Sequence, residues 1–143
     1  MAGEVEILAR DYIFEVDANG GSAYVVIGGI DTFSLGSEKT DVERTIFTDN
    51  GIPRHWVAQR GNTLTLTGKR LQNPNSGTRD PGQQEAETLA GAVGYSSLGS
   101  FRITDPGGVV KTFLGSCKLS DIGGGNNDTT SWGIEITVSG AIT

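Results

Sequence analysis

Residues 130–139 read TSWGIEITVS, and this stretch decides the fold class of the chain. Its apolar residues share one parity, and they are Trp132, Ile134, Ile136 and Val138. Serine, glycine, glutamate and threonine occupy the other parity. Because successive side chains of a strand point to opposite faces, this alternation predicts a β-strand with one buried face.

The segment before this strand predicts a β-hairpin. Residues 99–119 contain FRIT and VVKTFLGSCKL on either side of the sequence Asp105-Pro106-Gly107-Gly108. Proline presets the backbone for a turn and glycine accepts positive φ, so this tetrapeptide is a strong turn signal.

Three further strands are expected closer to the N-terminus. Leu64 and Leu66 alternate with threonines over residues 63–67. Residues 7–16 and 23–30 are rich in β-branched and aromatic residues, which favour strands, and residues 17–21 between them are typical of a turn.

One segment has helical rather than strand periodicity. Asp80 can cap a helix that begins at Pro81, and apolar residues recur at helical spacing in Ala86, Leu89, Ala90 and Val93. The sequence therefore predicts a short amphipathic helix over residues 81–93.

These elements predict a mainly β chain, an antiparallel β-sandwich or small barrel with one short flanking α-helix. Glycine makes up 22 of 143 residues without a three-residue period, against a typical share of about 7%, which suits a turn-rich β protein. The length predicts a single domain over residues 1–143.

Charge and cysteine content narrow the class of protein. The chain has a net charge of −6 and its lysines and arginines are scattered, so it lacks the basic patch that binding to nucleic acid phosphates requires. The single cysteine, Cys117, allows no disulfide within the chain and suits a reducing compartment. No window is apolar enough for a membrane span, and the acidic N-terminus is unlike a signal peptide.

Residues 36–61 form a long, charged segment that also carries apolar residues. The turn signal Asp49-Asn50-Gly51 predicts a hairpin that projects from the body, with residues 42–47 opposite residues 55–59. Exposed apolar residues on such an arm are best explained by a partner surface. We therefore expect this segment to make contacts between subunits.

No catalytic, cofactor or metal site is predicted. His55 is the only histidine, so a histidine-based triad or a zinc site lacks partners, and surface packing or an interface contact explains this residue better. The glycine-rich run 123–128 lacks a following helix and is interpreted as a hairpin tip rather than a phosphate cradle. Residues 17–20 lack the downstream glutamate of a calcium loop.

The order of these elements resembles the major tail tube proteins of long-tailed, lambda-like bacteriophages. The resemblance covers GNTLTLTGKRL at residues 61–71, Asp80-Pro81-Gly82-Gln83-Gln84 at the head of the helix, and the hairpin that begins at Phe101. It also covers Phe113-Leu114-Gly115 and the final Val138-Ser139-Gly140. The C-terminal immunoglobulin-like domain that some family members carry is not found here.

The resemblance implies a non-enzymatic virion protein, assembled in the bacterial host cytoplasm. It implies hexameric rings stacked into a tube that conducts phage DNA without binding it specifically and without insertion of the subunit into a membrane. The implied partners are further copies of the chain, a tape measure protein, a tail tip or baseplate initiator and a terminator. Related tubes occur in contractile tails and in type VI secretion.

Under this resemblance the projecting segment becomes the contact between rings or between subunits. The candidate contact residues are Glu38, Lys39, Asp41, Val42, Glu43, Arg44, Ile46, Phe47, Asp49, Arg54, Trp56 and Arg60. The N-terminal arm, residues 1–8, and the tip at residues 123–128 are further candidates.

An alternative function remains open from the residues alone. A monomeric β-sandwich that binds a carbohydrate or a protein would also carry scattered aromatic side chains. Concentration-dependent assembly separates this binding module from a tube subunit.

Overall fold

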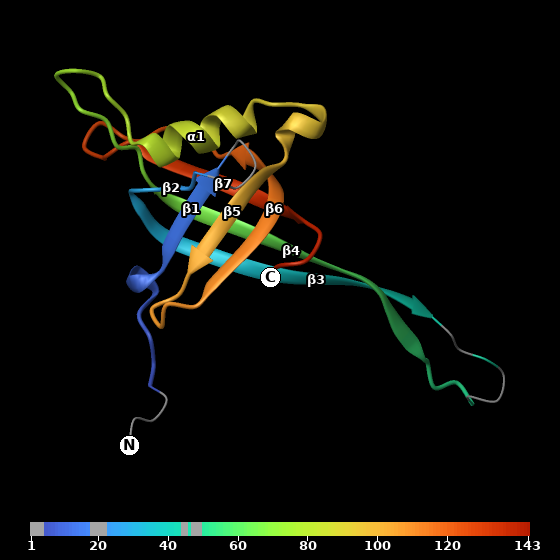
Figure 1. Ribbon diagram of the computed structural model, residues 1–143. Helices are drawn as coiled ribbons and strands as arrows, with labels where there is room; N and C mark the ends of the chain where they lie inside the picture. The colour runs from blue at the N-terminus through green and yellow to red at the C-terminus, as the bar shows by residue number, and fades with distance from the viewer. Residues whose placement is uncertain (1–4, 18–22, 44–45, 47–49) are drawn as a thin grey trace.

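The computed structural model describes residues 5–17, 23–43, 46 and 50–143, and within them the fold is mainly β and antiparallel (Figure 1). Seven strands form one sheet in the order β2-β1-β5-β6-β7-β4-β3. The strands are β1 (Ile13–Asp17), β2 (Val25–Val26), β3 (Ile30–Glu43), β4 (His55–Lys69), β5 (Gly99–Thr104), β6 (Val110–Leu119) and β7 (Ser131–Ser139). The described helices are α1 (Pro81–Ala90) and the 3-10 helices η1 (Ala9–Asp11) and η3 (Gly94–Ser97). This confirms the expected fold class.

The sheet bends so that its two halves face each other across a shared core. Figure 1 shows β1, β5 and β6 running across the direction of β7, β4 and β3. The Phe33 ring of β3 lies 4.8 Å from the Tyr12 ring and 5.0 Å from the Phe14 ring, measured between centroids. These aromatic contacts join opposite ends of the strand order, which explains how a single sheet encloses a core.

The strand at the C-terminal end supplies the centre of this core. Trp132, Ile134 and Ile136 of β7 are at most 1% exposed, and Leu64 and Leu66 of β4 pair with this same face. Burying each such side chain stabilises the fold by about 1.5–3 kcal/mol. The alternation in residues 130–139 therefore acts as predicted, with Glu135 and Thr137 on the exposed face.

The predicted hairpin of residues 99–119 is also confirmed. Strands β5 and β6 pair from Gly99 opposite Gly115 to Thr104 opposite Val110. The Asp105 carboxylate accepts hydrogen bonds from the backbone N–H groups of Gly107 at 3.0 Å and Val109 at 2.9 Å. Gly108 adopts φ +85°, which is the left-handed conformation that glycine favours.

Two of the predicted strands have wrong boundaries. The strand expected over residues 7–16 begins at Ile13, because residues 9–11 form η1 instead. The strand expected over residues 23–30 is reduced to β2, and Ile30 already belongs to β3. The turn expected at residues 17–21 lies largely outside the described residues.

The helix begins as predicted but ends early. The Asp80 carboxylate accepts a hydrogen bond from the Gln83 backbone N–H at 3.1 Å, which caps the helix. The last helical residue is Ala90, not residue 93, because Gly91 terminates α1. Val93 fits the helical spacing but is 83% exposed, so the helix periodicity overestimated the buried stripe.

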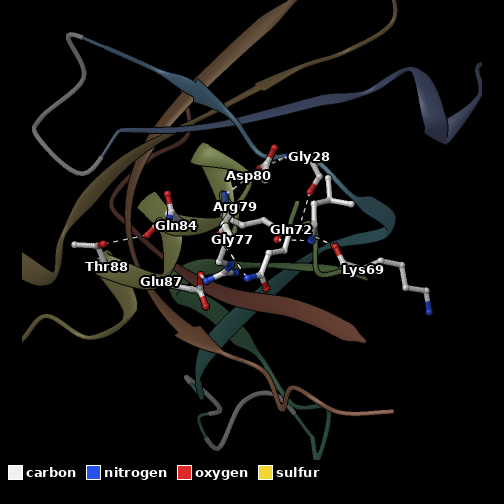
Figure 2. Close-up of polar contacts among 11 residues, drawn as sticks. Gly28, Lys69, Gln72, Gly77, Arg79, Asp80, Gln84, Glu87 and Thr88 are labelled. Atoms are coloured by element: carbon white, nitrogen blue, oxygen red, sulfur yellow. Dashed lines mark hydrogen bonds and ion pairs between the residues drawn. The ribbon is translucent and has the colours of Figure 1, made fainter. Parts of the chain in front are cut away.

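A polar network built by α1 fixes the helix against the sheet. The buried Gln83 side chain donates to the carbonyls of Gly28 at 3.0 Å and Lys69 at 2.8 Å, and accepts from the Leu71 backbone N–H at 3.1 Å. The Asp80 carboxylate also accepts from the Gly28 N–H at 3.0 Å (Figure 2). The helix therefore ties the end of β4 to the chain between β2 and β3.

An ion pair covers the outer side of this junction. The Arg79 guanidinium lies 2.5 Å from the Glu87 carboxylate, and both side chains are less than 20% exposed (Figure 2). This pair joins the residue just before the cap to the second turn of α1. Contacts on both its buried side and its outer side therefore hold α1 in place.

Candidate functional site: the projecting hairpin

The hairpin arises because β3 and β4 are much longer than the strand beside them. Strand β7 pairs with β4 only from Thr63 to Lys69. Residues 55–62 of β4 and 36–43 of β3 continue as a pair that leaves the body of the protein (Figure 1). Eight residues at about 3.4 Å per residue extend this arm roughly 27 Å beyond the sheet. We call residues 36–61 the projecting hairpin.

Its strands are extensions of core strands rather than a separate insertion. The buried Leu64 pairs with Leu35, and the same register continues outward to Lys39 opposite Arg60. The register shifts between Thr40 and Asp41, where Ala58 is the additional residue on β4. Such a bulge increases the local twist of a strand pair. The outer part of the hairpin is therefore turned relative to the sheet.

The cross-strand register divides the candidate contact residues between two faces. Val42 lies opposite Trp56 on one face, where these side chains are 50% and 61% exposed. Glu38, opposite Gly61, belongs to this apolar face as well. An exposed valine and tryptophan paired in this way form an apolar patch that a partner surface can cover.

The other face of the hairpin is charged. Lys39 lies opposite Arg60, and Glu43 lies opposite His55. The Lys39 ammonium also lies 3.5 Å from the Asp41 carboxylate, along the same strand and face. Because these groups are exposed, this ion pair adds little to the stability of the fold. Its mixed signs are instead suited to setting the register of a contact.

The remaining candidates lie near the tip. Ile46 is 57% exposed and Arg54 directly precedes β4. Arg44, Phe47 and Asp49 lie outside the described residues. Asn50 and Gly51 adopt positive φ values of 52° and 80°, as expected for the predicted turn signal.

Sequence reasoning missed two exposed apolar residues of the hairpin. Ile52 is 70% exposed and Val57 is 40% exposed. Ile52 directly follows the turn signal Asp49-Asn50-Gly51. Val57 lies on the charged face opposite Asp41, and the bulge at Ala58 places it there. Alternation alone places the neighbours Trp56 and Val57 on opposite faces, but only the register shows which of the two faces each one takes.

The other candidate contact segments lie elsewhere on the molecule. Residues 123–128 are exposed and connect β6 with β7, where the Gly125 backbone N–H donates to the Asp128 carboxylate at 3.0 Å. Val5, Ile7 and Leu8 of the N-terminal arm are all more than half exposed. In the part of the chain that the structure describes, neither segment pairs with a strand of the projecting hairpin.

The described residues hold no arrangement typical of a metal site, since no group of three His, Cys, Asp or Glu side chains converges there. His55 is exposed on the hairpin. Burial raises the pKa of the Cys117 thiol to about 11, so this thiol is protonated at neutral pH. In the same described ranges, no helix is long and apolar enough to cross a membrane.

Comparison with known proteins identifies relatives by structure and not by sequence. No protein-family model matches the chain, and no curated protein matches its sequence. The tail of an empty gene transfer agent particle, refined with C6 helical symmetry, contains a chain with 15% identity and a TM-score of 0.68, covering 96% of this chain and 98% of that one.

Two further solved structures share the fold. The SPP1 tail tube has 15% identity and a TM-score of 0.61, with 94% of this chain and 77% of that chain covered. The baseplate of the anti-feeding prophage contains a chain with 10% identity and a TM-score of 0.61, covering 99% of this chain and 96% of that one. The resemblance found in the sequence is thus confirmed at the level of structure, and the chain has the fold of phage tail tube proteins.

Proposed function

We propose that this chain is a structural subunit of a tail tube, in which hexameric rings stack into a hollow tube that conducts DNA. The observation that carries this proposal is the projecting hairpin on a tail tube fold. Its length, its exposed Val42–Trp56 pair and its charged opposite face suit a contact between stacked rings. The subunit then acts through assembly rather than through catalysis.

The apolar face supplies the buried part of this contact. Trp56 and Val42 lose exposed surface when a neighbouring ring covers them, and aromatic residues dominate the energetics of protein interfaces. Lys39, Arg60, Asp41 and Glu43 on the other face fix the rotation of one ring on the next through charge complementarity.

The net charge of the subunit suits a conduit for DNA. Six copies at −6 each sum to −36 per ring (6 × −6). At physiological salt, such charges act over about 8 Å, so only wall groups close to the duplex repel it. A repulsive wall leaves the polymer mobile, whereas a basic wall would bind the phosphates.

The proposal includes the partners of a tail. These are further copies of the same chain, a tape measure protein, a tail tip or baseplate initiator and a terminator, with assembly in the bacterial host cytoplasm. DNA passes through the lumen without a specific binding site.

Negative-stain electron microscopy over a concentration series tests the proposal, with averaging of end-on views. We expect hollow tubes or rings with six-fold symmetry. Compact monomers at every concentration, both alone and with a co-expressed tail tip complex, would favour the monomeric binding module.

A matched pair of variants tests the role of the hairpin. Trp56→Ala, alone and with Phe47→Ala, should abolish tubes and leave the circular dichroism spectrum unchanged. The control is Tyr95→Ala in η3, which removes an aromatic side chain that is 92% exposed and far along the chain from the hairpin. Tubes that survive Trp56→Ala, or that are lost equally with Tyr95→Ala, would contradict the role of the hairpin.

A further inference from the structure

The two ends of the bent sheet are covered differently. Helix α1 covers one end, where Leu89 packs against Gly99 at the start of β5 and the Cys117 thiol donates to the Ala86 carbonyl at 3.3 Å. Strand β5 runs from there to Thr104, and the hairpin turn into β6 lies at the opposite end (Figure 1). Among the described elements, no α-helix covers this second end, where only the single turn η1 precedes Ile13 opposite Thr104.

An apolar groove lies at the uncovered end. We call it the open-end groove, and it has a volume of about 350 Å³. Its apolar lining consists of Tyr12, Phe33, Leu35, Ile103, Val109 and Ile142. Leu35 and Val109 remain 43% and 56% exposed, although neighbouring core residues are buried. The groove therefore presents apolar surface that its own chain leaves uncovered.

The rim of the groove offers one available cation. Asp105 and Lys111 both line it, but the Asp105 carboxylate is engaged by the backbone N–H groups of its own turn. Lys111 is exposed and forms no ion pair with any residue that the structure describes. A segment that fits the groove should therefore be apolar and carry a carboxylate.

The N-terminal arm has this composition. Val5, Ile7 and Leu8 are 82%, 56% and 53% exposed, and Glu6 lies among them. Figure 1 shows this segment leaving η1 and running away from the sheet. The apolar side chains of the arm are exposed to solvent, and so are Leu35 and Val109 of the groove.

We propose that the open-end groove receives residues 5–8 of a second copy of this chain, with Ile7 among the apolar lining and Glu6 beside Lys111. This inference rests on the proposed function, because it adds a second contact between tube subunits. The arm and the groove are different surfaces, so each copy both donates and accepts. Such a contact joins copies head to tail and can close a ring or extend a filament.

Disulfide capture between two full-length variants tests the contact. Both variants carry Cys117→Ser, which keeps a hydroxyl donor near the Ala86 carbonyl. One adds Ile7→Cys and the other adds Val109→Cys, with tags of different mass, and the two are mixed in a glutathione redox buffer. The control mixture replaces Val109→Cys by Thr88→Cys, an exposed position on α1 at the covered end.

We expect at least about fivefold more cross-linked heterodimer with Val109→Cys than with Thr88→Cys, because docking raises the local concentration of the two thiols. Equal yields at the two positions would overturn the contact. In a single chain carrying both Ile7→Cys and Val109→Cys, a disulfide within the chain as the main product would overturn the assignment to a second copy.

A charge exchange adds a test that packing alone does not predict. Glu6→Lys in the arm variant, or Lys111→Glu in the groove variant, should each lower the heterodimer yield at low ionic strength. Combining the two exchanged variants should restore it. A yield that ignores both exchanges would overturn the pairing of Glu6 with Lys111.

Electron microscopy of the same preparations separates this inference from the proposed function. Hollow tubes with equal capture yields overturn the groove contact alone. Preferred capture at Val109→Cys without tubes or rings supports the contact and counts against the tube. If neither tubes nor preferred capture at Val109→Cys is observed, both the groove contact and the proposed function are overturned.

Discussion

The side chain of Gln83 lies 2.8 Å from the carbonyl oxygen of Lys69, which joins the first turn of α1 to the end of β4. The same amide also holds the Gly28 carbonyl and the Leu71 N–H, and Gln83 is fully buried. One side chain thus satisfies three backbone groups from two segments that are far apart in the sequence.

Gln83→Leu keeps the approximate volume of the side chain but removes these hydrogen bonds. We expect the free energy of unfolding to fall by at least about 2 kcal/mol, because buried backbone groups lose their partners. Denaturant unfolding followed by circular dichroism measures this change. The control, Gln84→Leu, alters the exposed neighbour and should stay within about 0.5 kcal/mol of the unmodified protein. Equal effects of the two substitutions would contradict the role given to Gln83.

Gly82 is predicted to be intolerant of any side chain. A Cβ atom at this position would meet the Val26 carbonyl oxygen far inside van der Waals contact and the Ile27 Cα at 2.6 Å. We expect Gly82→Ala to push α1 away from β2 and to destabilise the fold by about 1–3 kcal/mol or more.

Gly91 provides the matched control for this substitution. Its nearest atoms to an added Cβ lie at 3.8 Å, and its φ of −87° suits any residue. Gly91→Ala should be neutral or stabilise by about 0.4–1 kcal/mol, since it restricts the unfolded chain. Thermal unfolding of the two variants in parallel measures both changes in stability. Similar losses of stability in the two would refute the close approach at Gly82.

The charged face of the projecting hairpin predicts a salt-dependent assembly defect. Replacing Lys39 and Arg60 by glutamate adds two acidic groups to the face that already carries Asp41 and Glu43. We expect tubes to disappear at low salt and to recover in part near 1 M salt, where charges are screened beyond about 3 Å. Sedimentation of assembled material over a salt series measures this.

The neutral pair Lys39→Gln and Arg60→Gln is the control for that defect. It removes the cations without adding like charges, so assembly should weaken less and depend less on salt. If the glutamate and glutamine variants behave alike at every salt concentration, charge on this face does not set the contact.

Cys117 predicts a loss of stability at alkaline pH. Burial raises the pKa of this thiol from 9.0 to about 11 in the folded chain. The folded state therefore binds the proton more tightly than the unfolded state does. The resulting stabilisation is fully present below pH 9 and is lost as pH rises from about 9 to about 11.

Comparing the unmodified protein with Cys117→Ser isolates this effect, because the other titrating groups are common to both. The difference in free energy of unfolding should be constant from pH 7 to 9 and then shrink toward pH 11. A difference that does not change over this range would show that the thiol titrates alike in both states.

The parts of the fold that follow from local chemistry could be predicted from the sequence. The alternation around Ile134 and the turn at Asp105–Gly108 define their strands without help from distant residues. The cap at Asp80 likewise identifies the start of α1. Each of these signals lies within about ten residues of the element that it defines.

The errors occurred where periodicity does not decide the boundary of an element. Residues 7–12 have strand-like composition, but the paired part of β1 begins only at Ile13 opposite Thr104, because pairing requires the partner strand β5. The position of Val93 repeats the helical spacing, yet the helix has already ended at Gly91.

The candidate site shows the same division. The projecting hairpin follows from the turn signal and from its apolar residues, but the expected pairing of residues 42–47 with 55–59 was wrong, since Val42 lies opposite Trp56 and Gln59 lies opposite Thr40. The composition of its two faces does not follow from these signals, since the bulge at Ala58 switches Val57 to the charged face and Trp56 to the face of Val42. A bulge depends on the register with the opposite strand and leaves no clear trace in a single sequence.

Strand β3, 14 residues long, is the last strand of the sheet, and no other described strand pairs with its outer side. An uncovered edge of this length is a template on which other chains add strands indiscriminately, and charged side chains along an edge discourage such addition. Glu38, Lys39, Asp41 and Glu43 occupy the outer half of that edge. The hairpin thus carries charges that disfavour strand addition along its open edge, and this protects the chain against amyloid-like stacking.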